Sequence, residues 1–386
     1  MSFRHAMLTA AAVLVTPFLA AAEQGVTADS VTFAQVAAFD GPAAALGTGM
    51  NLGIRAAFEE ANAAGGVHGR MLKLDNMDDG YEPDRSASLV KTVIDENNHI
   101  ALIGAVGTPT SSATQPIATE ADVPFIGPFT GAGFLRNADL GNIFNVRASY
   151  FAETEAWIQY LVDQQGMKSI AILYQDDGFG RVGLDGVTAA LEKRGMTLAA
   201  EGTYTRNTTA VKKALLEIRK AKPDAVVMVG AYKPVAEFIK LARKMKLDAA
   251  YVNISFVGSD ALAKELGDAG EGVIISQVVP FPWDASVPVV AQYTEALKAV
   301  DAAAEPGFVS LEGYIVGRLA IAGLEAVGKE LTRESYLAAL NGLTTVDLGG
   351  ASMVFGPGDN QGLDDVFMTR ITADGHFEPI TSGGGS

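Results

Sequence analysis

The chain has 386 residues, of which 48% are hydrophobic and 19% charged, so it has enough apolar material for a folded core, and a disordered chain, a collagen and a coiled coil are excluded. Its 29 basic and 45 acidic residues give a formal net charge of −16, which argues against nucleic acid and anionic membrane surfaces as partners. Cysteine is absent, which excludes thiol catalysis, cysteine-ligated metals and disulfides. The four histidines show no zinc-type spacing.

The N-terminus carries the pattern of an export signal. Arg4 lies in a basic start, an apolar run follows, and the small residues 20–22 suit a cleavage site, so residues 1–22 are predicted to be a cleaved signal peptide. A membrane anchor is the alternative, but the run is short for a membrane span and Pro17 interrupts it. No cysteine follows for lipid attachment, so we expect a periplasmic protein that is not a lipoprotein and does not insert into the membrane. Residues 382–386 resemble a flexible tail.

From residue 31 onward, apolar strand-like runs alternate with helical patterns. Strands are expected at residues 31–39, 71–76, 100–104, 123–126, 169–174, 197–201, 225–229, 250–254 and 272–279. Helices are expected at residues 51–64, 85–96, 109–121, 152–165, 182–194, 209–221, 234–245, 287–303 and 307–328. This alternation is typical of parallel sheets with helices on both faces. An irregular stretch at 127–148 separates two similar series, so the predicted fold class is α/β with two lobes.

The loop after the expected strand at 100–104 is rich in hydroxyl groups. Ligands of parallel sheets bind beyond the carboxyl ends of the strands, where this loop lies. With Thr108 as N-cap and Pro109 as the first helical residue, the N–H groups of Thr110 and Ser111 would be free to bind an anion such as a carboxylate. An ordinary capped helix is the alternative, and the density of hydroxyls favours the binding site.

Other loops at the same strand ends each offer an aromatic and a polar group. This is the composition of a small-molecule cleft, although each aromatic taken singly is more often a packing residue. The candidates in these loops are Phe129, Thr130, Gly131, Asp177, Phe179, Tyr232, Ser255 and Phe256.

Motifs for catalysis or cofactors are weak. Residues 178–183 match GxGxxG, but Asp176 and Asp177 precede the first glycine and would repel a pyrophosphate. Residues 75–80 are similar to the start of a calcium loop, but position twelve is Ser86 rather than glutamate. GxSxG, P-loop and HExxH motifs are absent. We therefore expect no enzyme, no cofactor and no metal site.

Several short stretches, taken in order and with their spacing, resemble the type I periplasmic binding proteins, the solute-binding components of ABC importers of the branched-chain-amino-acid type (Leu/Ile/Val-binding family). They are residues 62–70 (NAAGGVHGR), 78–83 (DDGYEP), 103–104 (IG), 114–116 (TQP), 170–174 followed by 177–180 (DGFG), and 271–273 (EGV). The resemblance covers essentially the whole mature chain.

The resemblance implies two Rossmann-like lobes with parallel sheets, which a three-crossover hinge joins and closes over a ligand. The crossovers are expected near residues 145–148, 276–279 and 348–352. Lobe 1 would comprise residues 27–146 and 277–350, and lobe 2 residues 147–276 and 351–381.

Residue by residue, the resemblance implies the following site. The lobe 1 serine of the family corresponds best to Ser111, with Thr108 and Thr110 as rivals. The clamp on the ligand carboxylate corresponds to Phe129, Thr130 and Gly131, and the lobe 2 aromatics correspond to Phe179 and Tyr232.

One position departs from the family pattern. The acidic residue that holds the ligand ammonium in branched-chain binders corresponds here to Ser255. A buried ammonium needs a charged or multiple-acceptor partner, so either Asp176 or Asp177 substitutes, or the ligand lacks an amino group. The extra aromatic residues, including Phe39 and Phe256, would suit an aromatic or bulky apolar carboxylate.

The resemblance therefore implies a monomeric binding protein that captures a small carboxylate-bearing solute, an amino acid or related organic acid, for an ABC permease in the inner membrane. Two alternatives stay open. One is a periplasmic ligand-sensing module for a membrane receptor. The other is an exported α/β enzyme, which the absence of a nucleophile motif disfavours.

Overall fold

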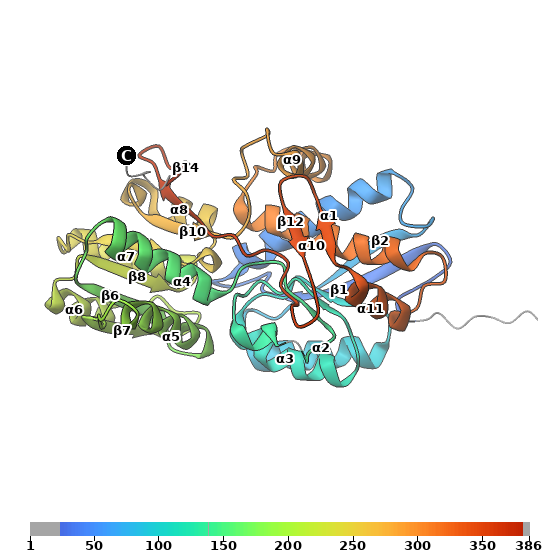
Figure 1. Cartoon of the computed structure of the whole chain (residues 1–386), viewed down its shortest axis with the longest axis horizontal. Helices are drawn as coiled ribbons and strands as arrows, with labels where there is room; N and C mark the ends of the chain where they lie inside the picture. Colours follow the sequence, from blue (N-terminus) through green and yellow to red (C-terminus); the bar gives the residue numbers. More distant parts are fainter. Residues whose placement is uncertain (1–23, 138, 381–386) are drawn as a thin grey trace, which may run out of the picture.

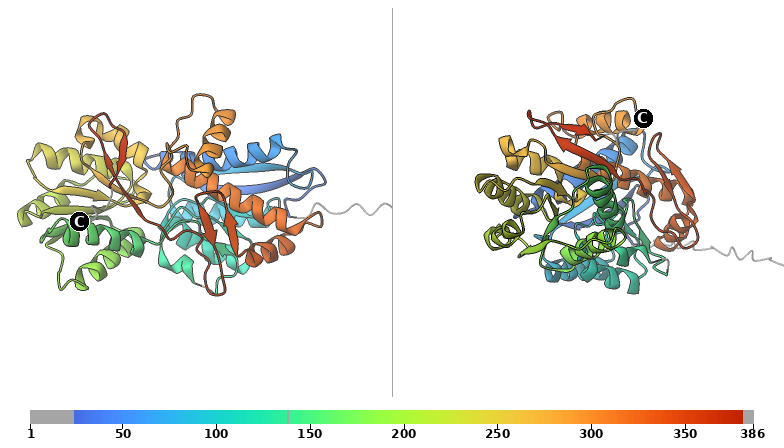
Figure 2. Two further views of the ribbon diagram at one scale, coloured as in Figure 1. Left: turned by 45° about the horizontal axis from the view of Figure 1, so that its top comes forward. Right: turned by 60° about the vertical axis from the view of Figure 1, so that its left-hand side comes forward.

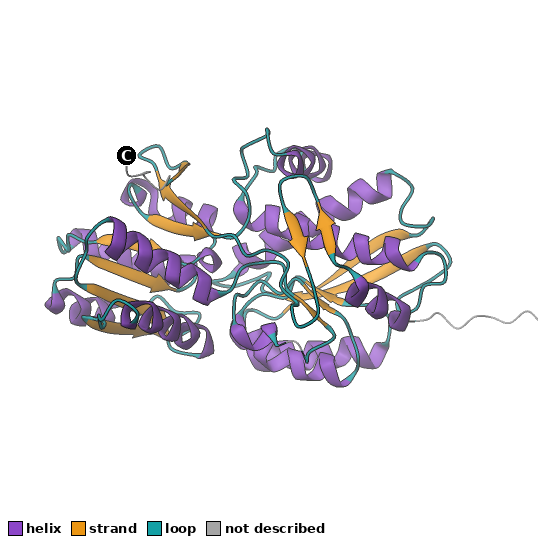
Figure 3. Cartoon of the chain, viewed as in Figure 1, coloured by secondary structure: helices purple, strands orange, loops and turns teal. Residues whose placement is uncertain are grey.

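The computed structural model describes residues 24–137 and 139–380. The predicted signal peptide and the tail at 382–386 lie outside the described residues. The described chain forms two α/β lobes that lie side by side along its long axis, with connecting segments between them (Figure 1; Figure 3). Within the described residues, no helix is long and apolar enough to cross a membrane, and no group of histidine, aspartate and glutamate residues is arranged to hold a metal ion.

Lobe 1 contains a five-stranded sheet of order β2-β1-β3-β4-β5, in which every pairing is parallel. Its strands are β1 Ser30–Ala37, β2 Met71–Asp78, β3 Leu102–Ile103, β4 Phe125–Ile126 and β5 Ile143–Phe144. Its helices are α1 Ala44–Ala63, α2 Pro83–Glu96, α3 Thr108–Glu120, α9 Pro288–Val300, α10 Phe308–Val327 and α11 Arg333–Gly342, with a short 3₁₀ turn at Gly133–Arg136. Helices α1 and α10 approach closely because Gly53 has no side chain, since a Cβ there would lie 1.9 Å from the carbonyl oxygen of Ser310.

Lobe 2 contains a seven-stranded sheet of order β14-β13-β10-β9-β8-β6-β7. Its strands are β6 Ile170–Gln175, β7 Ala200–Tyr204, β8 Ala225–Val229, β9 Ala250–Asn253, β10 Ile274–Gln277, β13 Phe367–Ile371 and β14 Phe377–Pro379. Its helices are α4 Tyr150–Ile158, which continues as a π-helix over Gln159–Gln164, α5 Gly178–Glu192, α6 Lys212–Ala221, α7 Tyr232–Lys244 and α8 Ser259–Leu266, with 3₁₀ turns at Ser255–Val257 and Gly267–Gly270. Strands β6 to β10 are parallel, whereas β13 and β14 form an antiparallel edge.

The lobes are joined by three segments of the chain, which follow β5, β10 and β12. Strands β11 (Thr345–Asp347) and β12 (Ser352–Val354) pair as a hairpin beside lobe 1 (Figure 1). Ser352 pairs with Asp347 in this hairpin, so residues 348–352, where the third crossover is expected, form its turn and the start of β12. The third segment runs along the first, since the N–H of Asn145 donates to Asn360 O at 2.8 Å. The division into lobes by residue number remains a proposal.

Candidate functional site

The carboxyl ends of strands from both sheets meet at the interface between the lobes (Figure 2). Gln175, the last residue of β6, donates through Nε2 to the hydroxyl of Tyr81, which follows β2, at 3.3 Å. Arg206 of lobe 2 forms an ion pair of 2.9 Å with Glu82 of lobe 1. The N–H of Ala45 in α1 donates to the hydroxyl of Tyr232 at 3.4 Å. The lobes are thus in contact.

The N-terminus of α3 lies at this interface and differs in detail from the expectation. Its N-cap is Gly107, in the left-handed region at φ 103°, and Thr108 is already helical. A Cβ on Gly107 would lie 2.2 Å from the ring of Tyr81, so a glycine is required there. Because the helix starts one residue early, the N–H of Ser111 donates to Gly107 O at 3.0 Å and is not free for an anion.

The hydroxyl groups that the sequence predicts at this site differ in where the structure places them. The hydroxyls of Thr108 and Thr130 lie 2.6 Å apart, and the Oγ of Ser111 is buried with no hydrogen-bond partner among the described residues. Thr110 is not brought into this group, because its hydroxyl donates to the backbone carbonyl of Gly107 at 3.0 Å and the residue lines a small void inside lobe 1.

Tyr150, the first residue of α4, was not anticipated from the sequence. Its N–H donates to Gly131 O at 2.8 Å, and a Cβ on Gly131 would lie 2.5 Å from its ring. Its hydroxyl is buried close to the Thr130 side chain, and it makes no hydrogen bond of good geometry with a described residue. Burial raises the pKa of the Tyr150 phenol, against the opposing influences of Arg147 and Thr130, so the hydroxyl stays protonated and can donate.

Five aromatic side chains from both lobes, all buried, form what we call the interlobe ring cluster: Tyr81 and Phe129 from lobe 1, and Tyr150, Phe179 and Phe256 from lobe 2. The centroid of Phe256 lies 4.6 Å from that of Phe179, 5.4 Å from that of Phe129 and 6.0 Å from that of Tyr81. The centroids of Tyr150 and Phe179 are 5.5 Å apart. The cluster therefore brings three predicted residues together with two that the prediction omitted.

A buried arginine lies against this cluster. The guanidinium carbon of Arg147 is 4.1 Å from the ring centroid of Phe129. Its Nε and Nη2 each donate to Glu312 of α10 at 2.8 Å, and its Nη1 donates to Ser255 Oγ at 3.1 Å. Burial by itself would lower the pKa of Arg147, but Glu312 raises the pKa above its ordinary value. The guanidinium is therefore a permanent cation at the interface.

Ser255 connects this arginine to a second buried acid, Glu153 of α4. The Ser255 backbone N–H and hydroxyl each donate to the Glu153 carboxylate at 2.9 Å. Ser276 also donates to Glu153, and accepts a hydrogen bond from Nε1 of Trp157 at 2.9 Å. Burial raises the pKa of Glu153, while Arg147 and these hydrogen bonds lower it.

The remaining predicted residues, Asp177, Phe39 and Tyr232, make other contacts. Asp177 caps α5, accepting the N–H of Phe179 at 3.0 Å, and forms an ion pair of 3.0 Å with Arg206. Phe39 is half-buried just beyond β1, and its N–H donates to Asp78 at 2.8 Å. Tyr232 contacts α1 as described above. The ring pairs of the cluster include neither Phe39 nor Tyr232.

The interlobe ring cluster and Ser255, together called the interlobe centre, are accompanied by three buried charged residues: Arg147, Glu153 and Glu312. The sequence analysis predicts none of these three as site residues, and only Glu312 leaves a sequence signal. Glu312 is the single acid in the first four turns of α10, whose side chains are almost all apolar and buried. A lone acid in such a helix indicates a buried partner. Arg147 and Glu153 lie in ordinary polar contexts, so their burial follows only from the tertiary fold.

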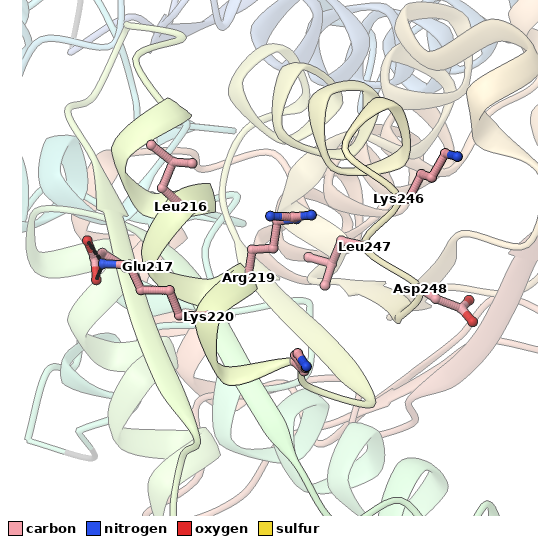
Figure 4. A pocket seen from close by; sticks show the side chains of 8 residues that line it. Leu216, Glu217, Arg219, Lys220, Lys246, Leu247 and Asp248 are labelled. Carbon is pink, nitrogen blue, oxygen red and sulfur yellow. Dashed lines mark hydrogen bonds and ion pairs between the residues drawn. The ribbon is translucent and has the colours of Figure 1, made fainter.

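An open hollow of about 650 Å³ lies on the outside of lobe 2, at the end of α6 (Figure 4). It is lined by Leu216, Glu217, Arg219, Lys220, Lys222, Lys246, Leu247 and Asp248. None of the predicted site residues lines it, so it is separate from the interlobe centre.

Comparison with known proteins identifies the family. A family model described as periplasmic binding protein matches residues 30–376. The chain belongs to the periplasmic binding protein family. This assignment confirms the predicted fold class and the resemblance, and it makes the chain a substrate-binding protein of the ABC-transporter type rather than an enzyme.

Individual periplasmic binding proteins are similar over most of the chain. A leucine-specific-binding protein of Salmonella typhimurium is 24% identical, with 87% of this chain and 88% of that protein covered. An amino acid binding protein of Pseudomonas aeruginosa is 23% identical, and this chain spans only 58% of its length.

Two solved structures share the fold. A possible leucine/isoleucine/valine-binding protein from Rhodopirellula baltica is 37% identical, with a TM-score of 0.87 and 94% and 98% of the two chains covered. A solute-binding protein of an ABC transporter from R. palustris, solved in complex with benzoate, is 19% identical, with a TM-score of 0.80 and 91% and 95% covered, and shows the fold alone.

Proposed function

We propose that the protein captures a small carboxylate-bearing solute between its lobes and delivers it to an ABC permease. One observation carries this proposal. Among the described residues, the buried hydroxyls of Ser111 and Tyr150 have no partner of good geometry; Ser111 is in the same helix as Thr108, and Tyr150 lies close to Thr130. Leaving a buried hydroxyl unpaired costs about 1–3 kcal/mol, and a ligand that accepts hydrogen bonds removes that cost.

A carboxylate suits these groups chemically. Its two oxygens accept several hydrogen bonds, which the hydroxyls of Ser111, Thr130 and Tyr150 can donate, and charge-assisted bonds are stronger than neutral ones. The guanidinium of Arg147 supplies a positive charge nearby, and the interlobe ring cluster offers an apolar surface to the rest of the solute.

The ligands named for two similar proteins are consistent with a carboxylate-bearing solute. One relative is named for leucine and one structural neighbour was solved with benzoate, and these two compounds have a carboxylate in common. We infer transport from the family, and a periplasmic location from the family together with the export signal expected at residues 1–22.

A thermal-shift screen of residues 23–381 tests the proposal, using amino acids, aliphatic and aromatic carboxylates, amides and purines. A ligand at 100 times its dissociation constant adds about 2.7 kcal/mol of stability, which is an easily measured shift. We expect hits among carboxylates only. Hits confined to amides or purines would contradict the proposal.

A further inference from the structure

Building on the proposed function, we infer that the solute has a carboxylate but no ammonium group. The inference rests on the donors and acceptors left available at the interlobe centre. Two of the buried groups without partners among the described residues, Ser111 Oγ and Tyr150 Oη, are hydroxyls suited to donate to an acceptor. The amide oxygens of Asn145 and Asn253 also lack partners among these residues, but they are neutral and carry no charge to balance an ammonium. The charged side chain that packs on the ring cluster is a cation, Arg147.

The two buried acids at the centre are already bonded. Both oxygens of Glu312 accept N–H groups of Arg147 at 2.8 Å. Glu153 accepts the N–H and the hydroxyl of Ser255 at 2.9 Å each, and also the hydroxyl of Ser276. An ammonium would have to displace these donors to reach either carboxylate.

Acids on the lobe 1 side of the interface are bonded as well. Asp79 accepts the N–H of Tyr81 at 2.8 Å and the hydroxyl of Ser86 at 2.7 Å. Glu82 accepts from Arg206 at 2.9 Å and from Asn207 at 2.7 Å.

The lobe 2 acids leave no better partner. Asp177 is held by Arg206 and by the N–H of Phe179, and Asp176 forms an exposed pair of 2.7 Å with Arg181. The carboxylate of Asp260 lies against Gly307, where it accepts from the N-terminus of α10.

An aromatic ring is the other common partner of an ammonium. Here Arg147 already covers a face of Phe129, and Arg206 lies 5.9 Å from the ring centroid of Tyr81. An amino acid bound with its carboxylate on the hydroxyls would therefore place its ammonium near Arg147, where each described carboxylate discussed above is already bonded and Arg147 occupies one face of Phe129.

Matched pairs of probes that differ only in the amino group test the inference by titration calorimetry: 4-methylpentanoate against L-leucine, and 3-phenylpropanoate against L-phenylalanine. We expect at least one deaminated acid to bind about 100-fold or more tightly than its amino acid, the discrimination expected when a charged group is buried without a partner. Isopentylamine and 3-phenylpropylamine should not bind.

Variants locate the effect. Tyr150→Phe keeps the ring packing but removes the unpartnered hydroxyl, and should weaken binding of the deaminated acid about tenfold, whereas Tyr160→Phe should not. Asp260→Asn should leave the preference for the deaminated acid unchanged.

The outcomes separate the two proposals. Equal or tighter binding of L-leucine or L-phenylalanine, or loss of such binding in Asp260→Asn, would overturn the inference and keep the proposed function. If none of the four carboxylates binds, and the wider panel also yields no carboxylate, the proposed function fails and the inference fails with it.

Discussion

At the scale of single residues, the hydroxyls of Ser111 and Tyr150 have no structural task that the described residues reveal. Other hydroxyls at the interface are bonded, such as those of Thr108 and Thr130, which pair at 2.6 Å. A buried polar side chain without a partner lowers the stability of the fold, and the binding role that we propose for these two hydroxyls would remove that cost.

The first prediction concerns this group. Ser111→Ala combined with Thr130→Ala should weaken carboxylate binding about 100-fold or more, because each hydrogen bond to a charged group contributes about 1.5–3 kcal/mol. Titration calorimetry measures the loss. Ser112→Ala is the matched control, since Ser112 is the exposed neighbour on the same helix, and should bind normally. Unchanged affinity in the double variant would remove the carboxylate from this position.

The second prediction concerns the buried ion pair of Arg147 and Glu312. Arg147→Met should lower the free energy of unfolding by about 3–5 kcal/mol, because Glu312 is left charged and unpaired in the interior. Arg147→Met combined with Glu312→Leu should recover most of this loss, since no unpaired charge remains. Urea unfolding measures both. A single variant as stable as the wild type would mean that Glu312 does not depend on Arg147.

The sequence places a residue at the interface most readily where the position of that residue follows directly from its own strand or helix. Phe129, Phe179 and Phe256 come together as ring neighbours because each follows a buried strand. Thr108 was misplaced as an N-cap, because a one-residue shift of the helix start turns its side chain toward Thr130. Tyr150 and Arg147 escaped notice because their burial comes from contacts with distant parts of the chain.

At the scale of elements, the length and apolar character of a strand decide whether its sequence reveals it. Strand β8, with five consecutive buried residues, has the bounds expected from the sequence. Strand β5 has only two residues, too few to show a period, and it lies within the stretch 127–148 that the sequence predicts to be irregular. The hairpin β11–β12 alternates exposed and buried residues over only three positions per strand, a pattern too short to be recognised in the sequence.

The third prediction concerns α8 and α10, which meet across the interface. Asp260 of α8 lies against the N-cap Gly307 of α10, and burial raises the pKa of its carboxyl from 3.8 to about 6. Between these values the folded state binds more protons than the unfolded state. The free energy of unfolding therefore falls as the pH rises from about 4 to about 6. Above pH 6 the ionised Asp260 carboxylate lowers this free energy by a constant amount of roughly 3 kcal/mol relative to low pH.

Asp260→Asn removes this titration. We expect the variant to gain stability relative to the wild type near pH 7.5 by roughly 2–3 kcal/mol, and to differ little near pH 4. Urea unfolding at both pH values checks this, with Asp268→Asn as an exposed control on the same lobe. A variant that loses stability near pH 7.5 would mean that the charge on Asp260 stabilises the fold.

At the scale of the whole molecule, the two lobes are held together by contacts near the centre and at the rim. Arg136 connects the loop at residues 127–132, which follows β4, to two of the segments that join the lobes. Its guanidinium donates to Ala132 O in this loop at 3.0 Å, to Arg147 O in the first segment at 2.7 Å, and through Nε to Gln361 in the third segment. These hydrogen bonds link the loop at residues 127–132 to the first and third connecting segments of the interlobe hinge.

The fourth prediction concerns the rim. Arg206→Ala breaks the interlobe pair with Glu82 and should speed solute release several-fold with little change in the association rate, because exposed pairs contribute about 0.2–1 kcal/mol each. Stopped-flow fluorescence separates the two rates. Arg181→Ala, which removes an exposed pair within lobe 2, is the control and should leave release unchanged. Equal effects of both variants would argue against a role for the rim in closure.

The central claim is that a carboxylate solute bound at the interlobe hydroxyls closes the lobes. Because the chain has no cysteine, Glu59→Cys in lobe 1 and Lys213→Cys in lobe 2 allow one dye on each lobe. The measurement is energy transfer between the dyes as carboxylates of the panel are added. We expect a saturable change in transfer for the otherwise wild-type chain and none, at the same concentrations, when Ser111→Ala and Thr130→Ala are also present. A saturating carboxylate that leaves transfer unchanged, or an identical response from the doubly substituted site, would contradict it.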